Sequence, residues 1–313
     1  MTSHLIGLIG SGIGSSLSPA LHEREADHHG IRYLYRIIDI GAPAPGSANA
    51  EPPPAPAPGD ADAEPPPAPN GAPTATDSVG DIVRWARRLG YTGLNITHPC
   101  KQTVIPHLDG LSPDAATLGA VNTVTFDGDR LIGHNTDWTG FARSFARGLP
   151  DAATDHVVQL GAGGAGAAVA HALLTLGTGR ITIADARPER AGGLAGELER
   201  RFGPGRADDA PLHTLDAALA GADGLVHATP TGMAAHPGMP LPADLLHPGL
   251  WVADIVYRPL ETALLRSARA TGCRTLDGGG MVVHQAAHAF RLFTGVEPDA
   301  DRMLAHLADL VAV

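Results

Sequence analysis

The stretch VVQLGAGGAGAAVAHALLTLG, at residues 157–177, constrains the fold of this chain more than any other. It has the pattern of a buried strand, a turn with Gly161, Gly163 and Gly166 in G-x-G-x-x-G spacing, and a helix of small and apolar residues. Asp185 closes the next strand-like run, about 20 residues further on. In a chain with 39 glycines the spacing alone is weak evidence. The preceding strand, the following helix and the acid together are typical of a dinucleotide-binding unit.

Each glycine has a physical role in such a turn. Gly161 permits the tight turn, Gly163 lets the backbone approach a pyrophosphate, and Gly166 lets the helix pack closely. The first turn of the helix adds unpaired N–H groups and the positive end of a dipole, which favour an anion. The predicted cofactor-binding residues here are Gly161, Ala162, Gly163, Gly164, Ala165 and Gly166. The alternative is a glycine-rich turn in an α/β domain without a ligand.

From residue 156 onward, predicted strands alternate with predicted helices. The strand-like runs are VVQLG, RITIAD, GLVHAT and WVADIV, a pattern that predicts a parallel, doubly wound sheet. Earlier in the chain, strands are predicted at 4–10, 33–40 and 93–97, helices at 20–29 and 79–89, and two short strands leading into a helix within 118–141. The length of 313 residues and this change of pattern predict two domains, with a boundary near residues 140–150.

Between residues 41 and 78 the composition changes to Pro, Ala, Gly, Asp and Glu. Such a segment buries too little apolar surface to offset its ordering entropy. We therefore predict a disordered Pro-rich insertion at residues 43–76, in a surface loop. A docking site for a proline-recognising partner is the minor alternative.

Charge and composition exclude several classes of function. The net charge is -11 and no basic block is present, which argues against a nucleic-acid partner. No segment reaches the roughly 18 apolar residues of a membrane span, so no membrane partner is expected. Cys100 and Cys273 are too few for a disulfide framework, and a cytoplasmic location is expected. His284 and His288 share a predicted helix but lack a third ligand at a supporting spacing, so no metal is predicted.

Lys101, at the end of the stretch GLNITHPCK, is the only lysine among 22 basic residues. A nicotinamide domain implies hydride transfer, and oxidation of an alcohol also requires a group that takes the hydroxyl proton. Arginine does not lose its proton in proteins, whereas a desolvated lysine can. A role in proton transfer is therefore a reason for lysine at this position. The alternative is a lysine in a surface salt bridge.

Six motifs, in the same order, resemble those of the shikimate dehydrogenases. They are Ser16-Leu17-Ser18-Pro19, Asn95-Ile96-Thr97-His98-Pro99-Cys100-Lys101, Gly119-Ala120-Val121-Asn122-Thr123, Asn135-Thr136-Asp137, the GAGGAG turn and Gln285-Ala286-Ala287. The resemblance runs from residue 5 to about residue 300, interrupted by the insertion, and is strongest to the NAD-using shikimate/quinate dehydrogenases. It implies an α/β substrate-binding catalytic domain at 1–140 plus 281–313, and a Rossmann-type doubly wound cofactor domain at 141–280.

In that family a polyhydroxylated cyclohexene carboxylate lies between the two domains. By resemblance, Ser16 and Ser18 bind its carboxylate, and Lys101 and Asp137 form the catalytic pair. The other residues matched to substrate contacts are Thr97, Asn122, Tyr257 and Gln285. A nearby carboxylate favours a charged lysine, whereas burial disfavours it. The sequence therefore leaves open whether Lys101 is the general base, an anchor for a substrate hydroxyl, or both.

The other residues matched to the cofactor site are Asp185, Arg187, Arg190, Thr229, Ile255 and Gly278. A carboxylate at Asp185 accepts hydrogen bonds from the adenosine ribose and repels a 2′-phosphate. In many NADP-using members of the family, the sequence at this position resembles Asn-Arg-Thr. Asp185 therefore predicts NAD as the cofactor, and Arg187 and Arg190 keep NADP as the alternative. One departure from the family pattern is His227, where asparagine is frequent.

The resemblance implies reversible NAD-dependent oxidation of a ring hydroxyl of shikimate, and of quinate, to the 3-dehydro ketone. Family members that use quinate well frequently have threonine at the position of Ser18, so we expect shikimate to be the better substrate. Two alternatives are a dehydrogenase for a related small molecule such as aminoshikimate, and a catalytically silent sensor. Retention of Lys101 and Asp137 argues against the sensor. The oligomeric state, monomer or homodimer, stays open.

Overall fold

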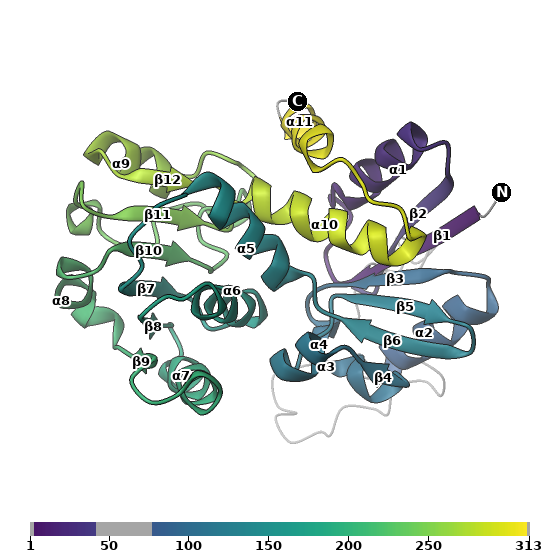
Figure 1. The fold of residues 1–313 in the computed structure, drawn as a ribbon, viewed down its shortest axis with the longest axis horizontal. Helices are drawn as coiled ribbons and strands as arrows, with labels where there is room; N and C mark the ends of the chain where they lie inside the picture. The colour runs from purple at the N-terminus through teal and green to yellow at the C-terminus, as the bar shows by residue number, and fades with distance from the viewer. Residues whose placement is uncertain (1–2, 42–76, 312–313) are drawn as a thin grey trace, which may run out of the picture.

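The computed structural model describes residues 3–41 and 77–311, which form two α/β parts, each built on a six-stranded sheet (Figure 1). The two sheets lie on opposite sides of the molecule, with the first in purple to blue and the second in green (Figure 1). The predicted fold class, two α/β domains, is confirmed. The insertion predicted at residues 43–76 lies outside the described residues.

The first sheet is mixed, with strand order β2-β1-β3-β5-β6-β4. Its strands are β1 (Ser3–Gly10), β2 (Arg32–Asp39), β3 (Gly93–Ile96), β4 (Gly110–Leu111), β5 (Thr123–Asp127) and β6 (Arg130–His134). The helices of this part are α1 (Ser18–His28), α2 (Asp77–Arg88), α3 (Cys100–Thr103), α4 (Pro113–Leu118) and the 3-10 helix η2 (Ile105–His107). Strands β1 and β3 run parallel, so the chain segments that follow them leave from the same edge of the sheet.

The second sheet is parallel throughout, with strand order β12-β11-β10-β7-β8-β9. Its strands are β7 (His156–Leu160), β8 (Arg180–Ala184), β9 (Ala207–Asp209), β10 (Gly224–His227), β11 (Trp251–Asp254) and β12 (Arg274–Leu276). Its helices are α6 (Gly164–Thr175), α7 (Pro188–Phe202), α8 (Leu215–Ala220), α9 (Ala263–Thr271), η3 (Leu212–Thr214) and η4 (Ala243–Leu245). The order is that of dinucleotide-binding folds, and its direction reverses between β7 and β10. Ligands of such sheets bind outside the carboxyl ends of the strands at this switch point.

Two long helices, α5 (Asp137–Gly148) and α10 (Gly279–Thr294), pack against each other between the two sheets (Figure 1). A Cβ at Gly140 would lie 2.7 Å from the Met281 carbonyl oxygen, so glycine is what lets the helices approach this closely. α10 also packs on α1 and on α11 (Ala300–Val311), which brings the end of the chain back to the first sheet. None of the described helices is long and apolar enough to cross a membrane.

Predicted element boundaries agree with the structure to within a few residues. The strands predicted at 4–10 and 33–40 are Ser3–Gly10 and Arg32–Asp39. The helix predicted at 20–29 begins two residues earlier, at Ser18. Pro19 explains the difference, because proline is well tolerated in the first turn of a helix, where its missing N–H has no intrahelical partner to lose.

A buried carboxylate joins α1 to the C-terminal helix. Glu25 is 2% exposed and accepts hydrogen bonds from Arg302 Nε at 2.9 Å, from Arg302 Nη2 at 2.5 Å and from the Asp299 N–H at 2.8 Å. Burial alone would raise the pKa of Glu25, but the hydrogen bonds from Arg302, Asp299 and His29 bring the pKa below its usual value. The carboxylate form is therefore the one that the folded chain stabilises.

Replacing Arg302 with alanine is expected to lower the free energy of unfolding by about 2 kcal/mol at neutral pH, because charged hydrogen bonds to a buried group are lost. Since the folded-state pKa of Glu25 is lowered, this stabilisation is present above the unfolded-state pKa and disappears as the pH falls through the folded-state pKa. Urea unfolding of both proteins across acid pH measures the difference. Arg24→Ala is the matched control, because its ion pair with Asp309 also joins α1 to α11 but is exposed on both sides. Equal losses in the two variants would contradict the prediction.

Candidate active site

One cavity of about 530 Å³ is lined by segments from both α/β parts. All the residues predicted to be catalytic or substrate-binding line it, namely Ser16, Ser18, Thr97, Lys101, Asn122, Asp137, Tyr257 and Gln285. They come from the segments after β1, β3 and β11, from the residue before β5, and from α1, α3, α5 and α10. The fold thus brings the separate sequence motifs together in one place.

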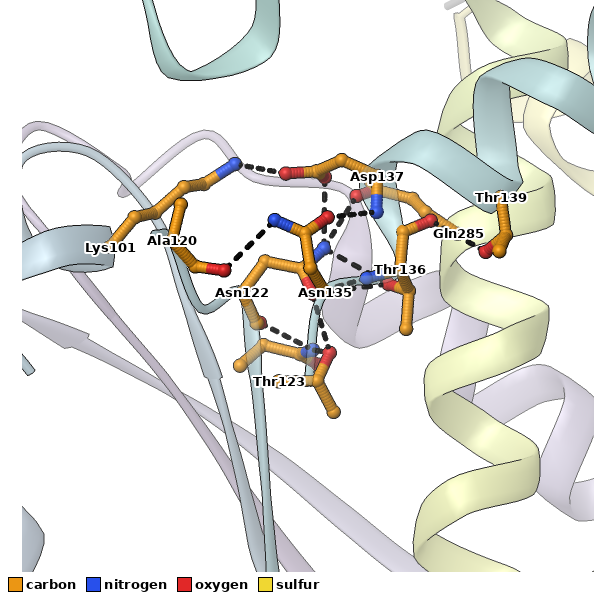
Figure 2. Close-up of polar contacts among 10 residues, drawn as sticks. Lys101, Ala120, Asn122, Thr123, Asn135, Thr136, Asp137, Thr139 and Gln285 are labelled. Atoms are coloured by element: carbon orange, nitrogen blue, oxygen red, sulfur yellow. Dashed lines mark hydrogen bonds and ion pairs between the residues drawn. The ribbon is translucent and has the colours of Figure 1, made fainter. Parts of the chain in front are cut away.

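Lys101 and Asp137 form an ion pair, with Lys101 Nζ 2.6 Å from Asp137 Oδ2 (Figure 2). The Lys101 side chain is 21% exposed and the Asp137 side chain 4%, so the pair is largely shielded from water while the ammonium group reaches the cavity. Asp137 is the first residue of α5, where the positive end of the helix dipole favours a carboxylate. The ammonium group has three N–H donors, so the ion pair leaves donors for a ligand in the cavity.

Asn122 is the centre of the polar network beneath this pair (Figure 2). Its Nδ2 lies 2.8 Å from Asp137 Oδ1, 2.9 Å from Thr136 Oγ1 and 3.3 Å from Gln285 Oε1. Its Oδ1 accepts the backbone N–H of Thr136 at 2.8 Å. Asn135 Oδ1 in turn accepts the backbone N–H of Asp137 at 3.1 Å. The two asparagines therefore fix the start of α5, and with it the direction of the Asp137 carboxylate.

The loop Ser16-Leu17-Ser18-Pro19, here called the SxSP loop, places two hydroxyls side by side at the start of α1. The Ser16 hydroxyl donates to Ser18 Oγ at 3.2 Å, and the Ser18 N–H donates to Ser16 Oγ at 3.3 Å. Both side chains line the cavity. Hydroxyls and N–H groups of this kind bind a carboxylate without an opposite charge.

Tyr35, which the sequence did not indicate as a site residue, contacts two residues that line the cavity, Ser18 and Asn95. Its buried hydroxyl donates to Asn95 Oδ1 at 2.8 Å and forms a hydrogen bond with Ser18. Burial raises the pKa of Tyr35, so it stays protonated and donates. Asn95, whose Nδ2 donates to Thr123 Oγ1 at 3.0 Å, also lines the cavity. Asn95 was visible in its motif, whereas nothing in the β2 sequence distinguished Tyr35.

Further lining residues come from outside the predicted set. His22 lies on the cavity wall, and burial lowers its pKa to about 3, so the imidazole is neutral there. Arg258, next to Tyr257, donates from Nη1 to the Ser15 carbonyl oxygen at 3.0 Å. This contact ties the segment after β11 to Ser15, next to Ser16, and both Arg258 and Ser15 line the cavity. Burial raises the pKa of Tyr257, with a smaller opposite effect from Arg258.

The glycine turn lies at the carboxyl end of β7, at the switch point of the second sheet. Gly161 has φ +102°, and a Cβ there would lie 2.5 Å from the Ala228 carbonyl oxygen. A Cβ at Gly166 would lie 2.2 Å from the Gly161 carbonyl oxygen, so only glycine lets α6 start this close to the strand. A Cβ at Gly163 or at Gly164 would meet nothing within 4 Å. The turn is therefore closely packed at Gly161 and Gly166 and has open space at Gly163 and Gly164.

This open surface matches a dinucleotide. No described side chain caps the N-terminus of α6, so its first N–H groups face the open side of the turn with the positive end of the helix dipole. Ala162 and Ala165 complete the turn with small side chains. The residues present thus suit the pyrophosphate of a nicotinamide dinucleotide, which supplies hydride transfer when bound.

Asp185 connects the glycine turn with the turn after β8. Its Oδ2 accepts the Ala162 N–H at 2.8 Å, and its Oδ1 accepts the Arg187 N–H at 2.9 Å. Arg187 and Arg190 are both exposed at the start of α7. The acid thus has a structural partner on each oxygen in addition to the ligand contact predicted for it.

The other predicted cofactor residues surround the carboxyl ends of β10 and β11. Thr229 lies two residues after β10, and its methyl group packs beside Gly161. Ile255 follows β11 directly, and a Cβ at Gly278 would lie 2.3 Å from the Ile255 carbonyl oxygen. Among the described residues, no group of three or more His, Cys, Asp or Glu side chains is placed to hold a metal ion.

Comparisons with known proteins also indicate the shikimate dehydrogenases. The family model "Shikimate dehydrogenase substrate binding domain" matches residues 70–124, and "Shikimate 5'-dehydrogenase C-terminal domain" matches residues 278–307. The chain is 63% identical to a shikimate dehydrogenase (NADP(+)) of Streptomyces avermitilis, over 98% of this chain and 96% of that protein. It is 45% identical to a quinate/shikimate dehydrogenase (NAD(+)) of Corynebacterium efficiens, over 98% and 99% of the two chains.

Solved structures agree over nearly the whole length. Quinate dehydrogenase from Corynebacterium glutamicum in complex with NAD superposes with a TM-score of 0.84 at 42% identity, covering 98% of this chain and 99% of that one. Shikimate 5-dehydrogenase from Thermus thermophilus in complex with NADP(H) and shikimate gives a TM-score of 0.77 at 32% identity, covering 98% and 99%. From its motifs, its strand order and these likenesses, the chain belongs to the shikimate dehydrogenase family.

Proposed function

We propose that this protein is an oxidoreductase that reversibly oxidises a ring hydroxyl of shikimate, and more slowly of quinate, to the 3-dehydro ketone with a nicotinamide dinucleotide. The observation that carries the proposal is the Lys101–Asp137 pair, 2.6 Å apart, in a cavity that also contains the predicted carboxylate-binding serines. Relatives of this chain bear the names of shikimate and quinate/shikimate dehydrogenases.

Each residue of the site has a proposed role that agrees with its chemistry. Ser16 and Ser18 hold the substrate carboxylate, which fixes the ring at one end of the cavity. Asn122 is hydrogen-bonded to Asp137 and so orients the Asp137 carboxylate. It also orients the ring hydroxyls of the substrate. Lys101 Nζ then contacts the reacting hydroxyl and, as the unprotonated amine, takes its proton; Asp137 balances the charge of the ammonium group so formed.

The direct test is the absorbance of the reduced nicotinamide after shikimate, quinate or aminoshikimate is added to the purified protein with NAD or NADP. Turnover of shikimate supports the proposal. Binding of cofactor and shikimate without turnover would instead support a silent sensor, and preference for aminoshikimate would indicate the related dehydrogenase. The intact Lys101–Asp137 pair favours turnover.

Shikimate is expected to have a higher kcat/KM than quinate in the wild type. Quinate carries an extra hydroxyl on the carboxylate-bearing carbon, and the loop that binds the carboxylate must accommodate it. The position of the Ser18 hydroxyl is fixed by its contacts with Ser16 and with Tyr35 on β2. Ser18→Thr should lower the ratio of kcat/KM for shikimate to kcat/KM for quinate, measured at a fixed cofactor concentration. A wild-type preference for quinate would overturn this role of Ser18.

NAD is expected to be preferred over NADP, because the ionised Asp185 repels a 2′-phosphate at the end of β8. Asp185→Asn should narrow the NAD to NADP ratio of kcat/KM. The same change disturbs the glycine turn through Ala162, but this effect acts on both cofactors, so their ratio isolates the charge. Arg187→Ala is the companion variant: if the wild type prefers NADP and this variant loses the preference, the arginine rather than Asp185 sets the choice.

We also propose a cytoplasmic location. Cys100 and Cys273 are both buried free thiols, which suits a reducing compartment.

A further inference from the structure

A buried hydrogen-bonded chain crosses the ends of β10 and β11. His227 and Asp254 are the last residues of these strands, stand opposite each other in the parallel register, and are 0% and 1% exposed. His227 Nδ1 lies 2.9 Å from Asp254 Oδ1, and His227 Nε2 lies 2.5 Å from Thr229 Oγ1. The imidazole thus bridges a buried carboxylate and a hydroxyl that reaches the edge of the sheet. His227 is also the residue at which the sequence departs from the family pattern.

The partners of Asp254 determine which way the hydrogen bonds run. Its Oδ1 also accepts the Val256 N–H at 3.0 Å, and its Oδ2 accepts the Thr262 hydroxyl at 2.7 Å. A carboxylate with these donors only accepts, so the hydrogen of a neutral His227 lies on Nδ1. Nε2 is then the acceptor, and the Thr229 hydroxyl donates its only hydrogen to it. Thr229 Oγ1 also accepts the Thr231 N–H at 3.3 Å. Toward a ligand, the hydroxyl therefore has no hydrogen left to give and accepts through its remaining lone pair.

Thr229 lies where a ligand of this sheet would pass. It follows β10, whereas the glycine turn follows β7, and these two strands flank the switch point. A Cβ at Gly161 would lie 3.0 Å from Thr229 Cγ2, which places the threonine against the turn. In this strand order, β7 to β9 form one mononucleotide-binding half and β10 to β12 the other. Asp185 belongs to the adenosine half, so Thr229 belongs to the nicotinamide half.

We infer that the Asp254–His227–Thr229 chain is a positioning device that presents Thr229 as a fixed hydrogen-bond acceptor to a donor group of the nicotinamide riboside. The donor is the carboxamide NH₂ or a ribose hydroxyl, the two donor groups of that half. The inference rests on the proposed function, because it requires a nicotinamide dinucleotide at the switch point. His227 acts through Thr229 and does not itself contact the ligand. An asparagine at this position is too short to reach both Asp254 and Thr229.

The test is the Kd of NADH and NADPH, measured by fluorescence titration of the full-length wild type, His227→Asn, Thr229→Val and the double variant. Each single change is expected to raise the Kd of the cofactor that the wild type binds by about tenfold, the scale of one hydrogen bond. The double variant is expected to stay near tenfold, because both changes break the same chain. Inhibition by 5′-AMP, which occupies only the adenosine half, should not change. Thr229→Ser, which keeps the hydroxyl, should remain closer to the wild type than Thr229→Val.

The analogue with 3-acetylpyridine in place of nicotinamide identifies the donor. A smaller effect of Thr229→Val on this analogue assigns the carboxamide, and an equal effect assigns a ribose hydroxyl. Unchanged cofactor Kd in Thr229→Val, or a double variant near a hundredfold, would overturn the inference. So would a lower melting temperature in His227→Asn with unchanged Kd, since that result defines a purely structural network. A wild type that binds neither cofactor would instead refute the proposed function itself.

Discussion

Replacing Lys101 with alanine is expected to lower kcat by about 10²-fold or more and to change KM far less. The ε-amine is used mainly in the transition state, where a positioned acid–base group contributes on the order of 10²- to 10⁴-fold. The structure supports this because Lys101 Nζ faces the cavity while paired with Asp137 at 2.6 Å. Steady-state kinetics with shikimate measure the loss. An unaltered kcat would remove Lys101 from the chemistry.

Two further measurements separate the roles of this lysine. Lys101→Arg keeps the positive charge and hydrogen-bond donors but does not release a proton, so a loss as large as that of alanine assigns proton transfer. Substantial activity in this variant would assign an anchoring role instead. Because the chain has no other lysine, labelling with an amine-specific reagent reports on Lys101 together with the N-terminal amine. Mass spectrometry should show that shikimate protects the lysine and leaves the N-terminus reactive.

Replacing Asp137 with asparagine is expected to lower kcat by on the order of 10² to 10³-fold, since it removes the charge that pairs with the lysine. The amide also brings an NH₂ group against either Lys101 Nζ or Asn122 Nδ2, both of which donate to the carboxylate now. The double variant Lys101→Ala with Asp137→Asn should be scarcely worse than the more damaging single one, because the pair acts as a unit.

Asp129→Asn is the matched control for this prediction. It removes a fully exposed carboxylate that forms an ion pair with Arg87 at the surface, away from the cavity residues. Its kcat should equal that of the wild type, since exposed ion pairs contribute little even to stability. If Asp137→Asn retained wild-type kcat while its melting temperature fell, the aspartate would have a structural role only.

Local patterns in the sequence predicted the elements of the site well. The glycine turn was found where expected because its spacing, the strand before it and the helix after it are all local along the chain. In the structure, Gly161 has a φ of +102° and Gly166 lies close to the Gly161 carbonyl oxygen. Both features require glycine, as the spacing predicted. Lys101 was singled out by composition alone, since one lysine in a chain of arginines is visible without any structure. The family motifs then named its partner, Asp137.

Other features depend on distant strands that meet in register. Tyr35 and Asn95 lie on β2 and β3, which both border β1, so the tyrosine reaches across one strand to the asparagine. Arg258 contacts the Ser15 carbonyl only because loops of the two α/β parts approach each other. No periodicity in the sequence records such contacts, because they join residues whose separation along the chain has no fixed value.

The sequence by itself determined the type of the main elements, the glycine turn and the side chains proposed for the site, since these follow from backbone sterics, periodicity and residue chemistry over short distances. Only the tertiary structure decided that the predicted substrate residues share one cavity, that Asn122 aims the Asp137 carboxylate, and that His227 links Asp254 to Thr229. The physical reason is that hydrogen bonds are short and directional. Whether two polar groups meet therefore depends on strand order, register and helix packing, which are properties of the whole folded chain.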